Sequence, residues 1–243
     1  MRLLAFCDFV GTNYVGWQRQ PNGISIQEAI EHALSIYFRS PIAIVGCGRT
    51  DSGVHGRNYG FHFDLPEIPE DAPFLFKINR ILPDDIVIRS IKVMEDNFHA
   101  RFSAKSRRYI YRIHTSKDPF IQPYSWYLDR LTPESVHILN EAATFIASLK
   151  DFSSFAKTGS NNKTTYCDMI QCEWKAHEDR LELHIAANRF LRGMVRLIVG
   201  GCANVAVGKL SLERMKELSL EGVVLPFAFS VPAQGLTFEG VEY

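Results

Sequence analysis

GCGRTDSGVHG, residues 46–56, is a polar, glycine-rich stretch with strand-like sequence on both sides. An apolar run over 42–45 precedes it, and the alternating aromatic residues Tyr59, Phe61 and Phe63 follow it. Alternation of apolar and polar residues is typical of a half-buried strand. The stretch is therefore predicted to be an irregular loop between two strands of a sheet, the second over about 57–64.

The predicted loop presents the carboxylate of Asp51 close to the guanidinium of Arg49. Loops that join strands and offer an acid beside an arginine are common places for catalysis. Asp-Ser-Gly is also ordinary turn chemistry, because Asp bonds nearby backbone groups and Gly accepts a positive φ. The stretch alone leaves both interpretations open, a turn or a catalytic loop.

The elements around this loop predict a layered α+β unit in the first part of the chain. Ser25 and Glu28 form a capping box, and apolar residues then recur at helical spacing to about residue 39. A second helix is expected over about 70–80. Further strands are expected over 2–10 and 85–94. The order β-α-β-loop-β-α-β favours a mostly antiparallel sheet with helices on one face.

The second part of the chain repeats these kinds of element with longer connections, and it suggests a domain over 98–243 after one over 1–97. Thr132, Pro133 and Glu134 are typical of a helix start, here for a helix to about 149. The remaining expected elements are strands over 165–175 and 181–187, helices over 189–206 and 211–219, and a closing strand over 236–242.

Composition places the chain among soluble globular proteins of one or two domains. It has 243 residues, of which 46% are hydrophobic and 22% charged. The five cysteines form no CxxC pair, which favours a reducing cytoplasm over a disulfide framework or a zinc ribbon. We expect no signal peptide at Met1-Arg2 and no membrane-spanning segment. Because the formal net charge is zero, any nucleic-acid binding has to come from local clusters of basic residues.

Three segments raise the question of RNA binding. The loop over 14–21 mixes aromatics, amides and Arg19, and it is either a packed turn with Trp17 in the core or a surface that touches a nucleotide. Residues 101–112 hold five basic residues and no acid, with Tyr109 and Tyr111 between them. Such a strand suits a polyanion with stackable bases, or it is a solvated strand face. A third cluster is a stripe of arginines expected on one face of the 189–206 helix, which is either solvated or lines a cleft: Arg189, Arg192 and Arg196.

Other chemistries find little support in the sequence. The residues His55, His62, Asp64 and His99 fit no known spacing of metal ligands. The chain has no phosphate-binding P-loop, no GxGxxG after a strand and no Gly-x-Ser-x-Gly elbow. What remains is acid chemistry at Asp51, or a binding site built from arginine and tyrosine.

Several blocks, in the same order along nearly the whole chain, resemble the tRNA pseudouridine synthase A family. The two most specific are GRTDSGVHG over 48–56 and NFHARFSAKSRRYIYRI over 97–113. The others are GTNYVGWQRQP (11–21), SIQEAIEHAL (25–34), NRILPDDI (79–86), DFSSF (151–155), NRFLRGMVRLIVG (188–200) and GLTFEGVEY (235–243).

The resemblance implies an α+β fold of two similar halves around a central cleft, usually in a homodimer. It implies the isomerisation of uridine to pseudouridine at positions 38, 39 and 40, in the anticodon stem-loop of tRNA, by a cytoplasmic enzyme. It further implies that the reaction needs no cofactor and no metal, and that the enzyme has no membrane partner.

The resemblance also assigns roles to residues. Asp51 matches the catalytic aspartate, and Arg196 matches the basic residue that pairs with it. Tyr109 matches the aromatic residue that stacks on the target uracil, and Arg49 matches a residue that takes part in flipping the base. The predicted RNA contacts are Phe98, His99, Ala100, Arg101, Phe102, Lys105, Arg107, Arg108, Gly159, Ser160, Asn161, Asn162, Lys163, Arg189 and Arg192.

Departures from the family pattern occur near both predicted clusters and remove none of these catalytic groups. They lie at Ser52, Gly56, Arg189, Arg192 and Gly193. The changes over 189–193 bear on which RNA contacts, and so which tRNA positions, the chain prefers. The sequence leaves open whether Asp51 attacks the sugar or removes a proton from C2′. Two other functions remain as alternatives, a non-catalytic RNA-binding module and a glycosidase that hydrolyses nucleosides.

Overall fold

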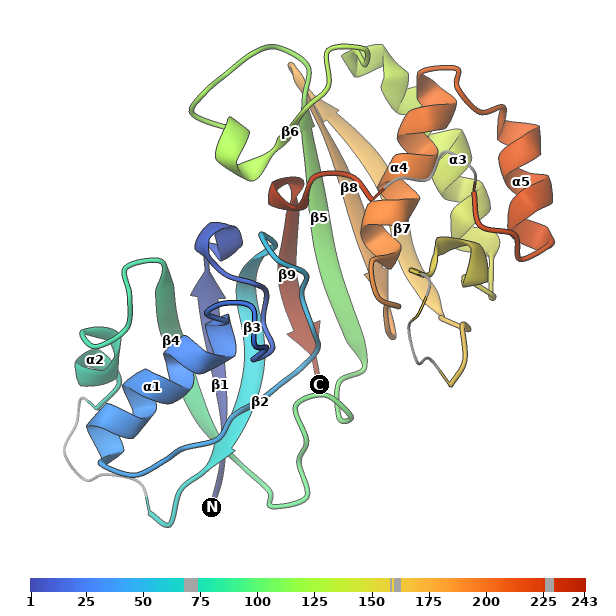
Figure 1. Cartoon of the computed structure of the whole chain (residues 1–243). Helices are drawn as coiled ribbons and strands as arrows, with labels where there is room; N and C mark the ends of the chain where they lie inside the picture. Colours follow the sequence, from blue (N-terminus) through green and yellow to red (C-terminus); the bar gives the residue numbers. More distant parts are fainter. Residues whose placement is uncertain (68–73, 158, 160–162, 226–229) are drawn as a thin grey trace. The chain divides into compact units, whose positions relative to one another are not determined.

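The computed structural model describes residues 1–67, 74–157, 159, 163–225 and 230–243, and its contacts divide the chain into two compact units (Figure 1). The first unit consists of Met1–Lys105 and Thr237–Tyr243, and the second of Ser106–Leu236. Each unit contains helices and a mainly antiparallel set of strands. The α+β class predicted from the sequence is therefore confirmed.

The first unit is built on the strand order β4-β1-β3-β9. β1 (Arg2–Phe9) lies antiparallel to both β3 (His55–Asp64) and β4 (Ile86–Met94), as alternation in the sequence indicates. β9 (Leu236–Glu242), from the far end of the chain, runs parallel to β3, with His55 opposite Thr237. The short β2 (Val45–Gly46) pairs with β3, and it leads into the polar loop.

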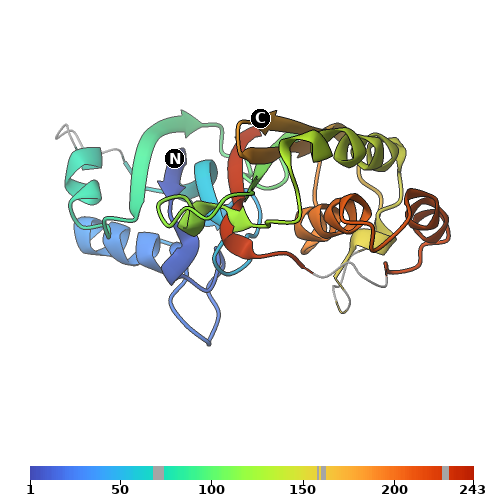
Figure 2. The same cartoon turned by 90° about the horizontal axis from the view of Figure 1, so that it is seen from above.

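Two helices cover one face of this sheet (Figures 1 and 2). α1 (Ile26–Phe38) follows its cap, where the Oγ of Ser25 accepts a hydrogen bond from the backbone N–H of Glu28 at 3.1 Å. Its apolar stripe is buried, including Ile30 and Leu34. α2 spans Phe74–Asn79. Part of the helix predicted over 70–80 lies outside the described residues, at 70–73.

The strand predicted over 42–45 is wrong in its extent, because side chains of α1 engage the backbone there. Ile44 donates its N–H to Glu31 at 3.1 Å, and its carbonyl oxygen accepts from Gln27 at 3.2 Å. Ile42 donates its N–H to Ser35 at 3.2 Å. These backbone groups are used by the helix, so strand pairing is confined to Val45–Gly46.

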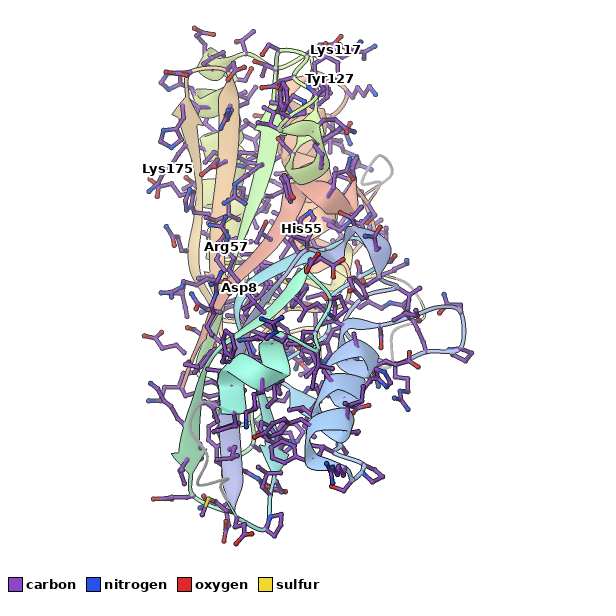
Figure 3. The ribbon with its side chains drawn as sticks, turned by 90° about the vertical axis from the view of Figure 1, so that its left-hand side faces the viewer. Asp8, His55, Arg57, Lys117, Tyr127 and Lys175 are labelled. Carbon is purple, nitrogen blue, oxygen red and sulfur yellow. The ribbon has the colours of Figure 1, made fainter. Side chains whose placement is uncertain are left out.

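The other face of the first sheet carries charged side chains. Arg2 on β1 forms an ion pair with Asp64 on β3 at 2.9 Å. Asp8 lies on the same side of β1 and pairs with Arg89 of β4 at 2.8 Å. Figure 3 shows Asp8 and Arg57 on the side of the strands away from α1. Period-two alternation thus gives this sheet one apolar face and one polar face.

The second unit has the strand order β5-β8-β7 with helices on one face (Figure 1). β5 (Ser106–His114), β8 (Arg180–Ala187) and β7 (Met169–His177) are antiparallel neighbours, and β6 (Trp126–Tyr127) adds to β5 in parallel. The helices are α3 (Val136–Ser148), α4 (Met194–Ala206) and α5 (Leu212–Leu220). Short 3-10 turns occur in both units at Gly11–Asn13, Gln122–Tyr124, Pro133–Ser135, Ser153–Phe155 and Ala233–Gly235.

The helix predicted over 189–206 begins later than expected, at Met194. Gly193, just before it, has a φ of 72°, a left-handed conformation that an α-helix does not continue through. The carbonyl oxygen of Arg192 accepts from Lys157 at 3.1 Å, and so serves another loop. The stripe of three arginines on one helical face is therefore wrong, because only Arg196 lies in α4.

Across the described parts of the chain, every helix is too short or too polar to cross a lipid bilayer.

Candidate active site

The loop between β2 and β3 presents Arg49 and Asp51 in the first unit. Arg49 is exposed and Asp51 is half-buried. The loop leaves the sheet after Cys47, whose N–H bonds the carbonyl oxygen of Gly60 at 2.8 Å. It returns through a turn in which Val54 donates its N–H to the carbonyl oxygen of Asp51 at 3.2 Å. The prediction of an irregular loop ahead of β3 is confirmed.

A second loop, over 11–17, holds this one in place. The carbonyl oxygen of Tyr14 accepts from Ser52 Oγ at 3.1 Å and from the N–H of Gly53 at 3.4 Å. Trp17 donates its N–H to the carbonyl oxygen of Thr50 at 3.3 Å. Gly16 makes this approach possible: its φ is 107°, and a Cβ there would lie 2.5 Å from the oxygen of Thr50. Residues on both sides of Asp51 are thus fixed by one neighbouring backbone.

Aromatic packing supports the N-terminal side of the loop. Tyr59 is fully buried, and its hydroxyl accepts from the N–H of Gly48 at 3.2 Å and donates to the carbonyl oxygen of Gly48. The ring of Trp17 stacks on Tyr59 with centroids 3.9 Å apart. Trp17 is only 2% exposed, so its predicted place in the core is confirmed, while Gln18, Arg19 and Gln20 of the same loop are exposed.

In the second unit, the alternation of β5 separates the residues of the basic segment. Tyr111 lies opposite the buried Leu183 of β8, on the side of the sheet that packs against the helices. Tyr109 and Arg107 share that side, because they are two and four residues away. Arg108 and Arg112 lie on the opposite side, where Arg112 pairs with Glu182 at 3.2 Å. Two of the three arginines of β5 therefore face away from the two tyrosines.

Tyr109 stands among groups from the segment that leads into α4. The ring of Phe190 meets it edge-on, with centroids 5.1 Å apart and planes at 86°. Arg107 donates to the carbonyl oxygen of Asn188 at 2.8 Å. The aromatic neighbour was missed because residues 189–193 were expected to be helical. Phe190 would then have been one of several apolar helix positions rather than part of the site.

Arg196, in the first turn of α4, lies on the same side of β5. Its Nε donates to the carbonyl oxygen of Val231 at 2.7 Å. Burial raises the pKa of Tyr111, and the nearby Arg196 charge opposes that rise. The hydroxyl of Tyr111 donates to the carbonyl oxygen of Pro232 at 2.8 Å. The structure thus brings Tyr109, Tyr111 and Arg196 into one region of the second unit.

The 98–102 segment, predicted to contact RNA, divides into a buried and an exposed part. Phe98 and Ala100 are buried. Arg2 donates to the carbonyl oxygen of Phe98 at 2.6 Å, and Ala100 donates its N–H to His62 Nδ1 at 3.1 Å. Phe102, in contrast, is 77% exposed. Phe98 and Ala100 therefore anchor the segment to the polar face of the first sheet.

His99 organises the exposed part of this segment. Its Nδ1 accepts from the backbone N–H groups of Arg101 at 3.2 Å and Phe102 at 3.4 Å, and its ring lies 4.3 Å from that of Phe102. Partial burial and the charge of Arg2 lower the pKa of His99, which favours the neutral ring as an acceptor. The guanidinium of Arg101 lies 5.6 Å from the centre of the Phe102 ring.

The remaining predicted RNA contacts are dispersed. Arg189 is half-buried, and five others are exposed: Lys105, Arg108, Gly159, Lys163 and Arg192. Ser160, Asn161 and Asn162 lie outside the described residues. Within single units, the structure therefore places Arg49 and Asp51 in one loop, Tyr109 on the same side of β5 as Arg107, and Arg196 near Tyr111.

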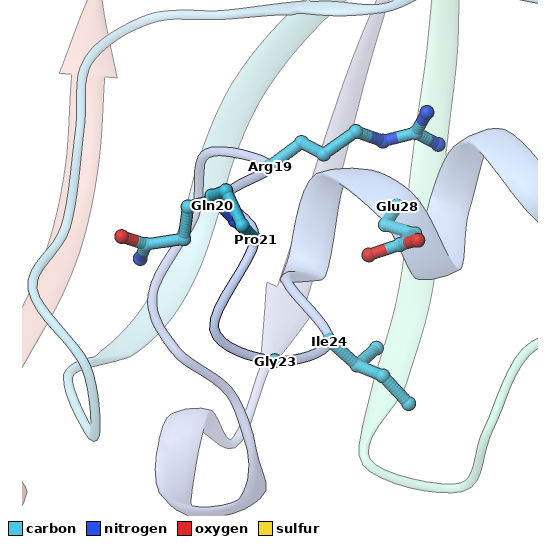
Figure 4. A pocket seen from close by; sticks show the side chains of 6 residues that line it. All are labelled: Arg19, Gln20, Pro21, Gly23, Ile24 and Glu28. Carbon is cyan, nitrogen blue, oxygen red and sulfur yellow. The ribbon is translucent and has the colours of Figure 1, made fainter.

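A surface hollow of about 600 Å³ lies on the 19–28 stretch of the first unit (Figure 4). Arg19, at its rim, pairs with Glu31 of α1 at 3.1 Å. The hollow is lined by Arg19, Gln20, Pro21, Gly23, Ile24 and Glu28. None of these is a predicted site residue. Within the described ranges, no three His, Cys, Asp or Glu residues gather as metal ligands would.

Comparison with known proteins gives a consistent result. A family model described as tRNA pseudouridine synthase matches residues 149–243. A protein from Parabacteroides distasonis is 39% identical over 244 residues, and one from Azobacteroides pseudotrichonymphae is 38% identical over 242 residues. A third, from Bacteroides fragilis, is 37% identical over 244 residues. Each alignment covers 100% of this chain and 96% of the relative, and all three relatives carry the name tRNA pseudouridine synthase A.

Proposed function

Because the chain belongs to the tRNA pseudouridine synthase A family, and so is an isomerase that forms pseudouridine in tRNA, we propose that Asp51 is its catalytic carboxylate and that its targets are uridines 38, 39 and 40 of the anticodon stem-loop. The observation that supports this role best is the setting of Asp51. It is half-buried in a loop that Tyr14 and Trp17 hold through the backbone on both sides of the carboxylate.

The reaction needs a carboxylate but no change of oxidation state. The bond between ribose C1′ and uracil N1 breaks, the base turns, and C1′ bonds to C5. The proton on C5 leaves, and a proton is taken up at N1. An ionised carboxylate can stabilise positive charge at C1′ or attack it, as in glycoside chemistry, or it can remove a proton from C2′. Each route requires an ionised carboxylate, and we assign Arg196 as the cation that would stabilise it.

A stacked uridine must first leave the RNA helix, which costs a few kcal/mol. Stacking on an aromatic side chain returns about 1–3 kcal/mol per base. Tyr109, with its ring held edge-on by Phe190, is the residue we assign to this task. Arg49 is exposed beside Asp51, and we assign it to the space that the base vacates or to a phosphate. The proposal requires the groups of both units to act on one uridine.

The same proposal covers the partners of the enzyme. Exposed basic residues, including Arg101, Lys105, Arg108 and Arg192, would hold the RNA backbone. The enzyme would act without a cofactor, as a homodimer, in the cytoplasm. Five free cysteines suit a reducing compartment.

Release of tritium from C5-labelled uridine in tRNA tests the role of Asp51. Wild-type protein is expected to release tritium, and Asp51→Ala is expected to release none above background. Asp8→Asn is the matched control, because Asp8 is also partly exposed but lies on the polar sheet face in an ion pair with Arg89. Equal release by wild type and Asp51→Ala would overturn the assignment.

Two further readouts separate the alternatives. Asp51→Ala that still binds tRNA with wild-type affinity would show that the carboxylate serves chemistry and not binding. A wild-type protein that binds tRNA but releases no tritium would favour the RNA-binding module. Free uracil as a product would indicate a glycosidase.

A further inference from the structure

Tyr14 and Asp85 make a part-buried polar contact next to the Asp51 loop. Tyr14 is 7% exposed, and its hydroxyl donates to Asp85 Oδ1 at 2.5 Å. The backbone N–H of Val10 bonds the carbonyl oxygen of Asp85 at 2.9 Å. Asp85 therefore holds the 11–17 loop both through the Tyr14 side chain and through the strand that enters that loop.

The same tyrosine connects this contact to the catalytic loop. Its carbonyl oxygen receives hydrogen bonds from Ser52 Oγ at 3.1 Å and from the N–H of Gly53 at 3.4 Å. These are the two residues that follow Asp51. A displacement of Tyr14 is thus passed directly to the backbone that carries the carboxylate.

The start of β4, which follows Asp85, is held on both sides. The side chain of Asn79, at the end of α2, bonds both the N–H of Ile88 at 2.8 Å and its carbonyl oxygen at 2.9 Å. Ile86 donates its N–H to the carbonyl oxygen of Pro83 at 3.0 Å, which closes a turn around Asp85. A side chain placed by a sheet and a helix end is a rigid reference point for a neighbouring loop.

We propose that Asp85 and Tyr14 are positioning residues for the pseudouridine reaction, and that their hydrogen bond sets where the Asp51 carboxylate lies relative to C1′ of the uridine. The proposal rests on the function proposed above for Asp51. It goes further by adding two residues that act on the chemical step through the loop and not through contact with RNA.

The physical state of the pair suits this role. Burial raises the pKa of the Tyr14 phenol, and the bond to Asp85 raises it further, so the hydroxyl stays protonated and remains a donor. A hydrogen bond from a neutral donor to a carboxylate is shorter and stronger than one between neutral groups. Its removal takes away the side-chain bond that ties Tyr14 to the start of β4, so that Tyr14 and the Ser52 and Gly53 groups bonded to its carbonyl oxygen are free to shift.

Single-turnover kinetics with enzyme in excess over tRNA tests the proposal. This rate constant belongs to the folded molecules, so a partly unfolded preparation does not lower it. Tyr14→Phe removes only the hydroxyl, and we expect its rate constant to fall about 10- to 100-fold, the effect of a displacement near 1 Å at a catalytic group. The dissociation constant for tRNA is expected to stay within about twofold, because neither residue is assigned to RNA contact.

Substitutions of Asp85 test the same hydrogen bond from its acceptor. Asp85→Ala removes the same bond from Tyr14 and also a longer one from Asn13 Nδ2 at 3.5 Å, so it should be at least as slow as Tyr14→Phe, and the double variant should be no slower than Asp85→Ala. Asp85→Asn keeps a carbonyl oxygen for the Tyr14 hydroxyl and should recover most of the rate. Tyr37→Phe is the control, since Tyr37 is a half-buried tyrosine of α1 whose ring packs on Phe38 and Phe74.

The outcomes are distinct. If wild type is active and Tyr14→Phe reacts at the wild-type rate, the positioning role is wrong while the function of Asp51 stands. A lower melting temperature of Tyr14→Phe with an unchanged rate constant would make the pair purely structural, and that also overturns the proposal. If wild-type protein forms no pseudouridine, the proposed function fails first and the positioning role fails with it.

Discussion

His62 shows how one side chain ties the 98–102 segment to the first sheet. It is 4% exposed, and its Nδ1 accepts a hydrogen bond from the N–H of Ala100 at 3.1 Å. An acceptor nitrogen has no proton, so the other ring nitrogen carries it and the ring is neutral. Burial, with the charge of Arg2, lowers the pKa of His62 to about 4.

This lowered pKa makes a prediction for stability against pH. In the unfolded chain the imidazole takes up its proton near pH 6.5, whereas in the folded protein it does so near pH 4. Between these values the unfolded state binds more protons, so the free energy of unfolding falls as the pH is lowered from 6.5 to 4. Allowing for solvent screening, we expect His62 to contribute about 1 kcal/mol to this fall.

Urea unfolding at pH 7 and pH 4.5 measures the effect. His62→Asn keeps an acceptor for the N–H of Ala100 but does not titrate, so its loss of stability between the two pH values should be smaller than that of wild type. His32→Asn is the control, because His32 is exposed on α1. An equal loss in wild type and His62→Asn would contradict the prediction.

At the scale of single residues, a candidate site residue could be predicted where the sequence around it forms a recognisable local pattern. Arg49 and Asp51 stand out because a glycine-rich loop between strands frames them. The hydrogen bond from Tyr14 to Asp85 joins residues 71 positions apart, and no local pattern announces it. The exposed Phe102 ring beside His99 is similar, since it depends on how the 98–102 segment folds back on itself.

At the scale of elements, a serine cap in the sequence indicated where a helix begins. A glycine before a helix did not, because its backbone conformation cannot be read from the sequence. Ser25 precedes α1 and Ser211 precedes α5, and each Oγ accepts the N–H three residues later. Both starts agree with the sequence. The start of α4 was misplaced because Gly193 does not show its left-handed φ in the sequence, and the apolar spacing around it is still helical.

The two serine caps should differ in their contribution to stability. Loss of a helix cap costs about 0.5–2 kcal/mol. Ser25 is fully buried, so Ser25→Ala should fall at the upper end of this range, whereas Ser211 is exposed and Ser211→Ala should fall at the lower end. Chemical unfolding of both variants beside wild type gives the two losses. A larger loss for Ser211→Ala than for Ser25→Ala would show that burial does not set the cost.

For the molecule as a whole, net charge hides how its charges are distributed. The chain has 27 basic and 27 acidic residues, so its formal charge is zero. Some basic groups are already paired, as Arg2 is with Asp64 and Arg214 is with Glu217.

The fold class and the family of the whole molecule could be predicted from the sequence, because matching blocks run along nearly the whole chain and the strands show apolar–polar alternation. Which side of β5 faces the helices, with Tyr109, Tyr111 and Arg107 on it, required the pairing with β8.

Binding of tRNA should therefore depend steeply on salt despite the zero net charge. Each phosphate contact that a basic residue makes adds about one to the slope of log affinity against log salt concentration. We expect Arg101→Ala to lower that slope by about one, measured by filter binding from low to physiological salt. Arg214→Ala is the control, since Arg214 is engaged with Glu217 at 2.9 Å within α5. Wild-type binding that is indifferent to salt would rule out the basic surface.

The pairing of β9 with β3 has a consequence for how the protein is made. Every other strand of the first unit leaves the ribosome before the second unit does, yet Thr237 and Phe238 of β9 complete the edge of β3 beside His55 and Gly56. Phe238 also packs on Tyr59, with ring centroids 5.0 Å apart. During translation, the nascent first unit therefore has an unpaired stretch of β3 at His55 and Gly56, and its sheet is completed only when β9 emerges.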